Sequence, residues 1–598
     1  MNMQPKQTSC STDYKRHSTY YSRGATLLDA VVSTALMLVV FMGIYGAFQL
    51  SIDVVTNNKS RAGAIALANE RQEYIRSLNY DAVGTLGGIP SGTFPQVEVA
   101  PLNGISYTRS TTILYEDDPA DGSGALDSNA IVTDYKLSTV EVSWVTRNGI
   151  TRTITLTTRI SPIGIEQSVP GGTLDLSILD SNTQPVAGAA VRIVNTTLVP
   201  AIDTTLDSNV GGKVTVYGAP PGAGYQITVT KSGYSSAQTY DATAINTNPT
   251  PGHLTVALNS TTAAPFSIDL VSTKNIRSFT PSDMLSWSDS FLNTSLVAAL
   301  NDTEVSGGDV ILGGGAGSYA PSGEVRSLPV TPTSVKEWGA FSWSDTRPAQ
   351  TGVLYRVYDG TTPLSDAALP GNSTGFSTSP INLSSISTTT YATLSLHATL
   401  SSSDVNATPS VHSWSVTYDT GPQPLSNITF GLQGTKTIGN GPGGLIYKYS
   451  TSTLSTGATA GINVPNLEWD TYTLSVDAAT GYDIASSCNP QPESLVPGAY
   501  AQTQIILEPH TTNSLLVNVR SSAGTLLLGA SVRLYRSPGY DTTRAADDCG
   551  QGFFSGLSAG TPGGGNPYSI DVSAAGYTTY SATDVSVSGT SYLSIVLN

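Results

Sequence analysis

Carboxylates that could hold a metal ion are concentrated in one short segment of this 598-residue chain. Six acids fall within nineteen residues: Glu116, Asp117, Asp118, Asp121, Asp127 and Asp134. Asp118, Asp121 and Asp127 could supply oxygen ligands to calcium, with a tight turn at Gly122. The alternative is an acidic surface loop without a metal, and no other cofactor is expected.

Side chains with catalytic potential are few and scattered. The five histidines never stand at the spacing of a metal-binding pair on a helix. Neither the zinc-protease pattern H-E-x-x-H nor the phosphate-loop ending G-K-[ST] occurs. The Gly-rich stretch at residues 313–318 is not followed by lysine, so we interpret it as a loop. The sequence therefore does not predict an enzyme.

An isolated carboxylate, Asp29, precedes an uncharged apolar run at residues 30–52. As a helix this run would be about 35 Å long, enough to cross the hydrocarbon core of a bilayer. Residues 1–24 hold four basic residues and one acid, so they would stay cytoplasmic while the rest is exported. A charge at the edge of such a run is costly in lipid, which indicates a function for Asp29.

Residues 23–41, RGATLLDAVVSTALMLVVF, resemble the class III signal of type IV prepilins. The resemblance implies that a prepilin peptidase removes residues 1–24 by cutting between Gly24 and Ala25. It also implies that Ala25 is methylated and that Asp29 is the acid used in filament assembly. The family usually has Glu and often Phe where this chain has Asp29 and Ala25. A plain signal-anchor helix is the alternative.

The same resemblance implies a structural subunit that polymerises through its N-terminal helix. Its partners would be other pilin subunits, the prepilin peptidase, the inner membrane and the pilus or secretion assembly machinery. The precursor would cross the bacterial cytoplasmic membrane once, and the mature protein would lie in an extracellular filament at the cell surface. A type IV pilus and a type II secretion pseudopilus stay open as alternatives.

Cleavage after Gly24 would remove Cys10 and leave two cysteines, Cys488 and Cys549. An even number of cysteines in an exported protein fits one disulfide. That disulfide would link the last two β-domains. Two unpaired buried thiols are the alternative.

A long helix over residues 25–78 is expected to carry these residues. Apolar residues recur at helical spacing in its second half: Ala64, Leu67, Ala68 and Ile75. Three glycines are expected to end the helix: Gly84, Gly87 and Gly88. Residues 79–168 then predict a small antiparallel pilin sheet, with alternating strands at 93–100, 105–115, 135–145 and 151–160.

An internal repeat organises the C-terminal part of the chain. GAAVRI at residues 188–193 matches GASVRL at 529–534, and a Y-x-[IL]-x-V strand followed by Gly-Tyr occurs three times. The pattern resembles the carboxypeptidase regulatory-like, transthyretin-like β-sandwich over residues 169–260 and 511–598, and more loosely over 422–510. Those family domains carry no catalytic groups. The Gly-Tyr pair is expected to set a turn and anchor an aromatic ring.

Residues 261–421 differ from the repeat and hold four of the six tryptophans: Trp287, Trp338, Trp343 and Trp414. Their alternating strands resemble a jelly-roll of the galactose-binding-like kind. These tryptophans could stack on sugar rings, or they could belong to the core.

The predicted architecture is an α+β N-terminal pilin module followed by all-β sandwich and jelly-roll domains. A head of 520 residues would crowd its neighbours in a repetitive fibre, which favours a minor pilin or pseudopilin at a filament tip. The alternatives are a pilus-associated adhesin that binds glycans or proteins, and a membrane-anchored surface protein that never polymerises. The net charge of −16 argues against nucleic acid, because phosphate binding needs clustered Lys and Arg.

Overall fold

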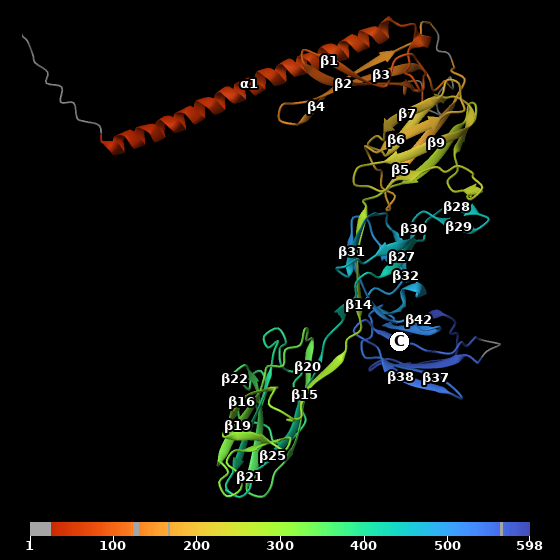
Figure 1. Cartoon of the computed structure of the whole chain (residues 1–598). Coiled ribbons are helices and arrows are strands. Elements are labelled where there is room, and N and C mark those ends of the chain that lie inside the picture. Colours follow the sequence, from red (N-terminus) through yellow and green to blue (C-terminus); the bar gives the residue numbers. More distant parts are fainter. Residues whose placement is uncertain (1–25, 121, 123–130, 165–167, 562–565) are drawn as a thin grey trace, which may run out of the picture.

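The computed structural model describes residues 26–120, 122, 131–164, 168–561 and 566–598. One long helix projects from a succession of β-sheet bodies (Figure 1). The predicted fold class is confirmed, because this helix is followed by a largely all-β body of many mainly antiparallel sheets.

Helix α1 (Leu27–Ser77) begins behind Thr26, which caps it together with Asp29. At its other end Leu78 is extended, with φ −79° and ψ 152°, and the short 3-10 helix η1 (Tyr80–Ala82) follows. The helix therefore stops before the glycines that were expected to end it.

The three glycines Gly84, Gly87 and Gly88 lie instead in the loop that leads to the head sheet, so the expectation that they end α1 is wrong. Gly87 has φ +70°, and a Cβ there would lie 2.9 Å from the carbonyl oxygen of Asp203. The amide of Asp203 donates to the Gly87 carbonyl at 2.9 Å. Gly87 thus allows two β-bodies to approach each other closely.

The head sheet packs against the second half of α1 (Figure 1). It is antiparallel, in the order of the chain, and its strands are β1 (Val97–Leu102), β2 (Ile105–Glu116), β3 (Tyr135–Val145) and β4 (Thr151–Ile160). These strands confirm the four predicted ones. All four apolar helix residues of the predicted stripe are at most 8% exposed and share a core with Val140 and Val142.

The first sandwich has two sheets around one core. One sheet has the order β10-β9-β6-β7, with β12 on β9, and the other has the order β13-β5-β8. Its strands are β5 (Gly172–Leu179), β6 (Ala190–Asn195), β7 (Ile202–Asp207), β8 (Lys213–Ala219), β9 (Gly222–Thr230), β10 (Ala237–Gln238), β12 (Leu254–Val256) and β13 (Thr261–Ser267). β13 runs parallel to β5 and closes the body.

The middle sandwich has the sheet β26-β14-β35-β33, with β31 on β14, and the sheet β30-β27-β32-β34. Its elements are β14 (Ser272–Thr280), β26 (Gln423–Pro424), β27 (Thr429–Gly434), β30 (Ser450–Ser455), β31 (Gly461–Leu467), β32 (Asp470–Val476), η3 (Ala478–Thr480), β33 (Tyr482–Ser487), β34 (Glu493–Leu495) and β35 (Tyr500–Pro509). Three further strands form a small sheet that joins this body to the first sandwich: β11 (Asn248–Pro249), β28 (Thr437–Gly441) and β29 (Gly444–Tyr447).

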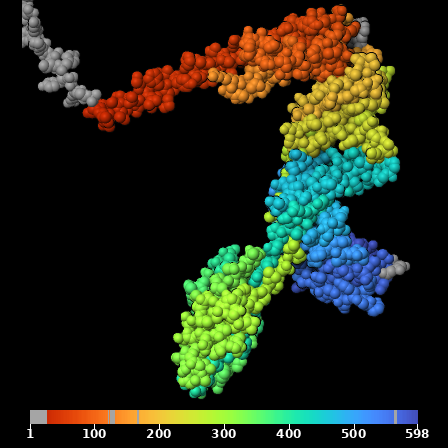
Figure 2. Space-filling model, viewed as in Figure 1, coloured from red at the N-terminus to blue at the C-terminus, as the bar shows by residue number. Residues whose placement is uncertain are grey.

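The inserted domain interrupts the middle sandwich. The chain enters it after β14 and returns to the middle sandwich at β26. Its sheets have the orders β17-β18-β25-β20-β23, with β15 on β25, and β16-β19-β24-β21-β22. Its strands are β15 (Met284–Asp289), β16 (Val297–Asn301), β17 (Thr303–Ser306), β18 (Asp309–Leu312), β19 (Ser322–Ser327), β20 (Glu337–Thr346), β21 (Thr351–Asp359), β22 (Thr362–Pro363), β23 (Ile381–Asn382), β24 (Ser395–Ser402) and β25 (Ser410–Asp419). Figure 2 shows it as a separate green lobe.

The last sandwich has the sheets β39-β36-β42 and β38-β37-β40-β41. Its strands are β36 (Ser514–Ser521), β37 (Ser531–Arg536), β38 (Tyr540–Ala545), β39 (Gln551–Phe554), β40 (Tyr568–Ser573), β41 (Tyr580–Val585) and β42 (Thr590–Leu597). As in the first sandwich, the first and last strands, β36 and β42, pair in parallel.

One predicted boundary, at residue 261, is displaced. β13 and β14 were assigned to the jelly-roll, but β13 pairs with β5 of the first sandwich and β14 with β35 of the middle one. The physical reason is that each closing strand pairs in parallel with a strand far away in the sequence. Such a partner leaves no local signal, whereas a hairpin turn does.

The repeat tyrosines occupy equivalent places. Tyr225, Tyr472 and Tyr568 are at most 1% exposed, and their hydroxyls bond to the carbonyls of Pro220, Glu468 and Ser558. The glycine of each Gly-Tyr pair has φ between +77° and +84°, as the predicted turn requires. The following aromatic ring is not always anchored, because Tyr577 stays 36% exposed.

Candidate functional site

The first half of α1 is apolar and almost entirely exposed, and we call it the bare half. Within the part of the chain that the structure describes, α1 is the one helix long and apolar enough to cross a membrane. Its most apolar stretch has a mean hydropathy of 2.3, and none of that stretch is buried. No residue in 26–59 is buried. The buried residues of α1 all lie in its second half: Ser60, Gly63, Ala64, Leu67, Ala68, Arg71, Gln72 and Ile75. The helix is thus divided into an unpartnered half and a docked half.

The structure places Asp29 at the tip of the bare half, in a capping box. The Thr26 amide donates to Asp29 Oδ2 at 3.1 Å, and the Asp29 amide donates to Thr26 Oγ1 at 3.3 Å. This cap was not predicted, although Thr-x-x-Asp before an apolar run is its sequence signal. Gly24 and Ala25, the predicted cleavage and methylation residues, lie outside the described residues.

The docked half approaches the head sheet closely at Gly63. A Cβ on Gly63 would lie 2.5 Å from the hydroxyl oxygen of Tyr107. That hydroxyl donates to the Ser60 carbonyl at 2.9 Å, and Tyr107 is 1% exposed. Further along, Gln72 Nε2 donates to the carbonyls of Ser138 at 3.3 Å and Leu156 at 3.0 Å. Helix and sheet therefore meet through specific polar contacts as well as apolar packing.

A buried charge cluster adds to this attachment. Glu98 on β1 is ion-paired with both Arg71 of α1 and Arg109 of β2. Arg109 Nη1 also donates to the Leu67 carbonyl of the helix at 3.1 Å. Arg71 and Arg109 are both less than 9% exposed, so Glu98 holds two largely desolvated guanidinium groups. Losing one member of such a cluster leaves a buried charge without its counter-charge.

Lys136 on β3 is a further buried basic residue, and it lies beneath the end of α1. Its Nζ donates to the carbonyls of Tyr80 at 2.7 Å and Val83 at 2.9 Å. Nζ also lies 4.5 Å from the centroid of the Tyr80 ring. Burial lowers the pKa of the Lys136 ammonium to about 8, and it raises the pKa of Tyr80 to about 12.

Of the three predicted calcium ligands, the structure describes only Asp118. Asp121 and Asp127 lie outside the described residues. Asp118 is described, and its amide donates to Asp134 Oδ2 at 2.5 Å while its Oδ1 accepts from the Ala120 amide at 3.2 Å. Among the residues that the structure describes, no group of three or more His, Cys, Asp or Glu side chains could hold a metal ion. Calcium binding stays a prediction.

The predicted disulfide is present. Cys488 and Cys549 are joined, with Cα atoms 4.5 Å apart and a separation of 61 residues in the sequence. Cys488 follows β33 of the middle sandwich, and Cys549 precedes β39 of the last one. The Ser487 amide donates to Gln551 Oε1 at 2.6 Å beside the disulfide. The bond therefore links two bodies, as expected.

The tryptophans of the inserted domain belong to its core. Trp338 is 0% exposed and Trp414 is 1% exposed, and Trp287 and Trp343 pack against the same core. Trp343 also stacks on the buried Tyr355, with ring centroids 4.0 Å apart. The alternative that these rings stack on sugars is therefore not supported by their positions.

The serine-hydrolase pattern G-x-S-x-G was missed in the sequence, where its letters occur twice, as GLSAG at residues 556–560 and as GNSTG at 371–375. In the first, the Ser558 backbone bonds to the buried Tyr568 hydroxyl of the same sandwich. Residues 371–375 form a turn and a loop without the strand-to-helix corner of that pattern. Ser373 Oγ donates to Asp366 Oδ2 at 2.5 Å, and the Asn372 side chain bonds to the backbone of Val357. The segment therefore closes a loop and does not show the Ser–His contact of a nucleophile.

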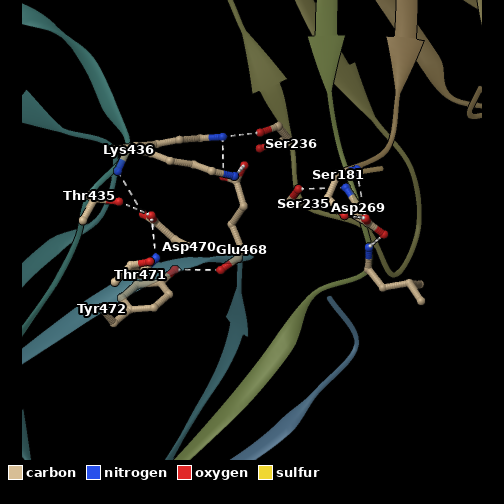
Figure 3. Close-up of polar contacts among 12 residues, drawn as sticks. Ser181, Ser235, Ser236, Asp269, Thr435, Lys436, Glu468, Asp470, Thr471 and Tyr472 are labelled. Carbon is tan, nitrogen blue, oxygen red and sulfur yellow. Dashed lines mark hydrogen bonds and ion pairs between the residues drawn. The ribbon is translucent and has the colours of Figure 1, made fainter. Parts of the chain in front are cut away.

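The junction between the first and middle sandwiches is polar (Figure 3). Lys436 and Lys448 share the carboxylate of Glu468, at 2.7 and 2.5 Å. Lys448 Nζ also donates to the Ser236 carbonyl of the first sandwich at 2.8 Å. With the pairing of β11 and β28, these contacts hold the two bodies together.

No protein-family model matches this chain, and no curated protein matches it. Among solved structures, the Bacillus anthracis TIE protein is similar at 11% identity and a TM-score of 0.15, over 84% of this chain and 74% of that one. The major pilin subunit of Bacillus cereus follows at 13% and 0.13, over 72% and 99%. The minor pilin of Streptococcus agalactiae follows at 10% and 0.16, over 56% and 96%. TM-scores this low do not establish a shared fold.

Proposed function

We propose that the chain is a minor type IV pilin or pseudopilin, a structural subunit of an extracellular filament or secretion machine. The observation that carries the proposal is the division of α1. Its docked half is fixed to a four-stranded head, while its other half is apolar, unburied and free of charge between Asp29 and Asp53. An apolar surface of this size needs a cover, which is lipid before assembly and neighbouring helices afterwards.

The proposal extends to processing and location. A prepilin peptidase cuts between Gly24 and Ala25, Ala25 is methylated, and assembly machinery moves the helix from the cytoplasmic membrane into the filament. The β-bodies that follow the head are far larger than α1 and its sheet, which favours a place at the tip. No catalytic role is proposed.

The test is N-terminal sequencing of the protein recovered from sheared surface filaments. We expect a methylated N-terminus at Ala25. Recovery only from membranes, with residues 1–24 still attached, would instead identify a signal-anchored surface protein.

A further inference from the structure

The outer face of one sheet of the inserted domain carries a row of two arginines with a histidine between them. In the order β16-β19-β24-β21-β22, Arg326 pairs with His397, and His397 pairs with Arg356. These residues therefore lie side by side on three adjacent strands. Their chain neighbours Val325 and Leu396 are fully buried in the core, so the row faces away from it.

Tyr358 adds a flat surface to this row. It follows Arg356 by two residues on β21 and therefore shares its face of the sheet. Its ring stacks on His397, with centroids 4.4 Å apart and an angle of 22°. His397 is 4% exposed whereas Tyr358 is only partly buried, so the imidazole supports one side of the phenol ring. The other side can receive the C–H edge of a ligand ring.

A cavity of about 220 Å³ opens at this place. Its polar lining includes Asn301, Glu324, Arg326, Tyr358 and His397. Pockets for drug-sized ligands are commonly about 300–1,000 Å³, so this cavity suits a single small ring. The Asn301 amide and the Glu324 carboxylate offer a hydrogen-bond donor and acceptors for hydroxyl groups.

The charges of the inserted domain also single out this face. Residues 281–421, all of which the structure describes, contain twelve acids and only four Lys or Arg. Two of the four are in ion pairs, Lys336 with Asp548 and Arg347 with Asp345. The other two, Arg326 and Arg356, form no ion pair, and both lie in the row. The Arg326 side chain makes no hydrogen bond to the described residues either, so its guanidinium is available to a ligand anion.

We propose that this cavity binds a pyranose sugar that carries a carboxylate. Arg326 receives the carboxylate, because a guanidinium donates two parallel hydrogen bonds to it. The sugar ring packs on Tyr358, and its hydroxyls bond to Asn301 and Glu324. Glu324 favours this ligand over a simple carboxylate, because its carboxylate accepts a hydrogen bond from a sugar hydroxyl and acetate has no hydroxyl to donate. The site does not depend on filament assembly, so it is tested separately from the proposed function.

The test uses the full chain in detergent and saturation-transfer NMR with three probes: sodium glucuronate, D-glucose and sodium acetate. We expect glucuronate to bind at least tenfold more tightly than either glucose or acetate. Arg326→Gln should weaken glucuronate binding by about tenfold to a hundredfold, the range for loss of a charge-assisted hydrogen bond. Tyr358→Leu should reduce glucuronate binding as well, because the platform is lost.

Lys336→Gln is the matched control, since it removes one positive charge from the same domain outside the cavity. It should leave glucuronate binding unchanged. Equal melting temperatures of the variants establish that Arg326→Gln is folded. The proposal is overturned if glucuronate gives no saturation transfer, if acetate binds as tightly as glucuronate, or if folded Arg326→Gln binds like the wild type.

Discussion

Asp29 can serve two partners with one carboxylate. Within the chain it accepts hydrogen bonds from Thr26 and caps α1. In a filament it would accept the cationic α-amine of a neighbouring Ala25, which otherwise has to be buried unpaired at a cost of several kcal/mol. The cap needs an acceptor oxygen, whereas the second role needs a negative charge. The two roles can therefore be separated by substitution.

Asp29→Asn keeps a side-chain oxygen for Thr26 and loses the charge. We expect it to be processed after Gly24 and to be absent from sheared filaments, as judged by immunoblotting of both fractions. Thr26→Ala is the control, because it removes the cap at a cost of about 1 kcal/mol and keeps the carboxylate. It should enter filaments. Wild-type amounts of Asp29→Asn in filaments would show that charge pairing has no part in assembly.

Because of Lys136, we expect the free energy of unfolding of the head to be larger at about pH 10 than at about pH 8. Its pKa is lowered to about 8 in the folded protein, against about 10.4 in an unfolded chain. Between these values the unfolded state binds the extra proton, so the free energy of unfolding rises with pH. From about pH 8 to about pH 10 the gain is roughly 2 kcal/mol. Above that range, ionisation of tyrosines in the unfolded chain opposes it.

Hydrogen exchange of β2 and β3, corrected for intrinsic rates, measures this effect in the full chain. Protection should increase over the stated pH range in the wild type. Lys136→Met lacks the titrating group and should show no such increase. A parallel increase in both proteins would assign the pH dependence to other groups.

Helix α1 combines two surfaces with different packing requirements. The bare half tolerates side chains of any size in the isolated chain, since a Cβ on Gly43 or Gly46 would meet nothing within 4 Å. The docked half does not, because Gly63 faces the Tyr107 hydroxyl. Glycine normally lowers helix stability by about 1 kcal/mol relative to alanine. Its presence at position 63 therefore reflects packing against the head.

Gly63→Ala should loosen the docked half of α1 despite its better helix propensity. We expect faster proteolysis between α1 and the head, with an apparent loss of about 1–3 kcal/mol from overpacking. Gly43→Ala is the matched control and should leave head proteolysis unchanged. Adding Tyr107→Phe to Gly63→Ala removes the clashing oxygen and should restore part of the resistance. Unchanged proteolysis of Gly63→Ala would mean that the helix can shift away from Tyr107.

The elements also show what the sequence could predict. The helix, its buried stripe and the head strands were predictable because their signals are local periodicities of 3.6 and 2 residues. β13 and β14 were assigned to the wrong body because their parallel partners lie far away in the chain. The cavity was not predicted for the same reason, since pairing between strands far apart in the sequence brings together Arg326, His397 and Tyr358, which line it. The capping box at the start of α1 has a local signal, Thr26 followed three residues later by Asp29, but it was not predicted.

The disulfide between Cys488 and Cys549 couples the middle and last sandwiches. In the chain-entropy model, a crosslink closing a loop of this length stabilises the folded state by about 4 kcal/mol. We expect reduction to lower the melting temperature of the last sandwich and to leave that of the first sandwich unchanged. Calorimetry with and without reductant measures both. The Cys488→Ser/Cys549→Ser double variant should already melt at the lower temperature and ignore the reductant.

The place of the inserted domain has a mechanical consequence. The covalent path from α1 to this domain runs through the head, the first sandwich and β14, and reaches β15 at residue 284. The middle sandwich contributes only β14 to that path, and the last sandwich contributes nothing. Outside the inserted domain, a tension applied between a ligand on that domain and the N-terminal end of α1 is therefore carried by residues before 284. The last sandwich stands beside this path, so its unfolding would not lengthen the tether, whereas the middle sandwich shares β14 with the path.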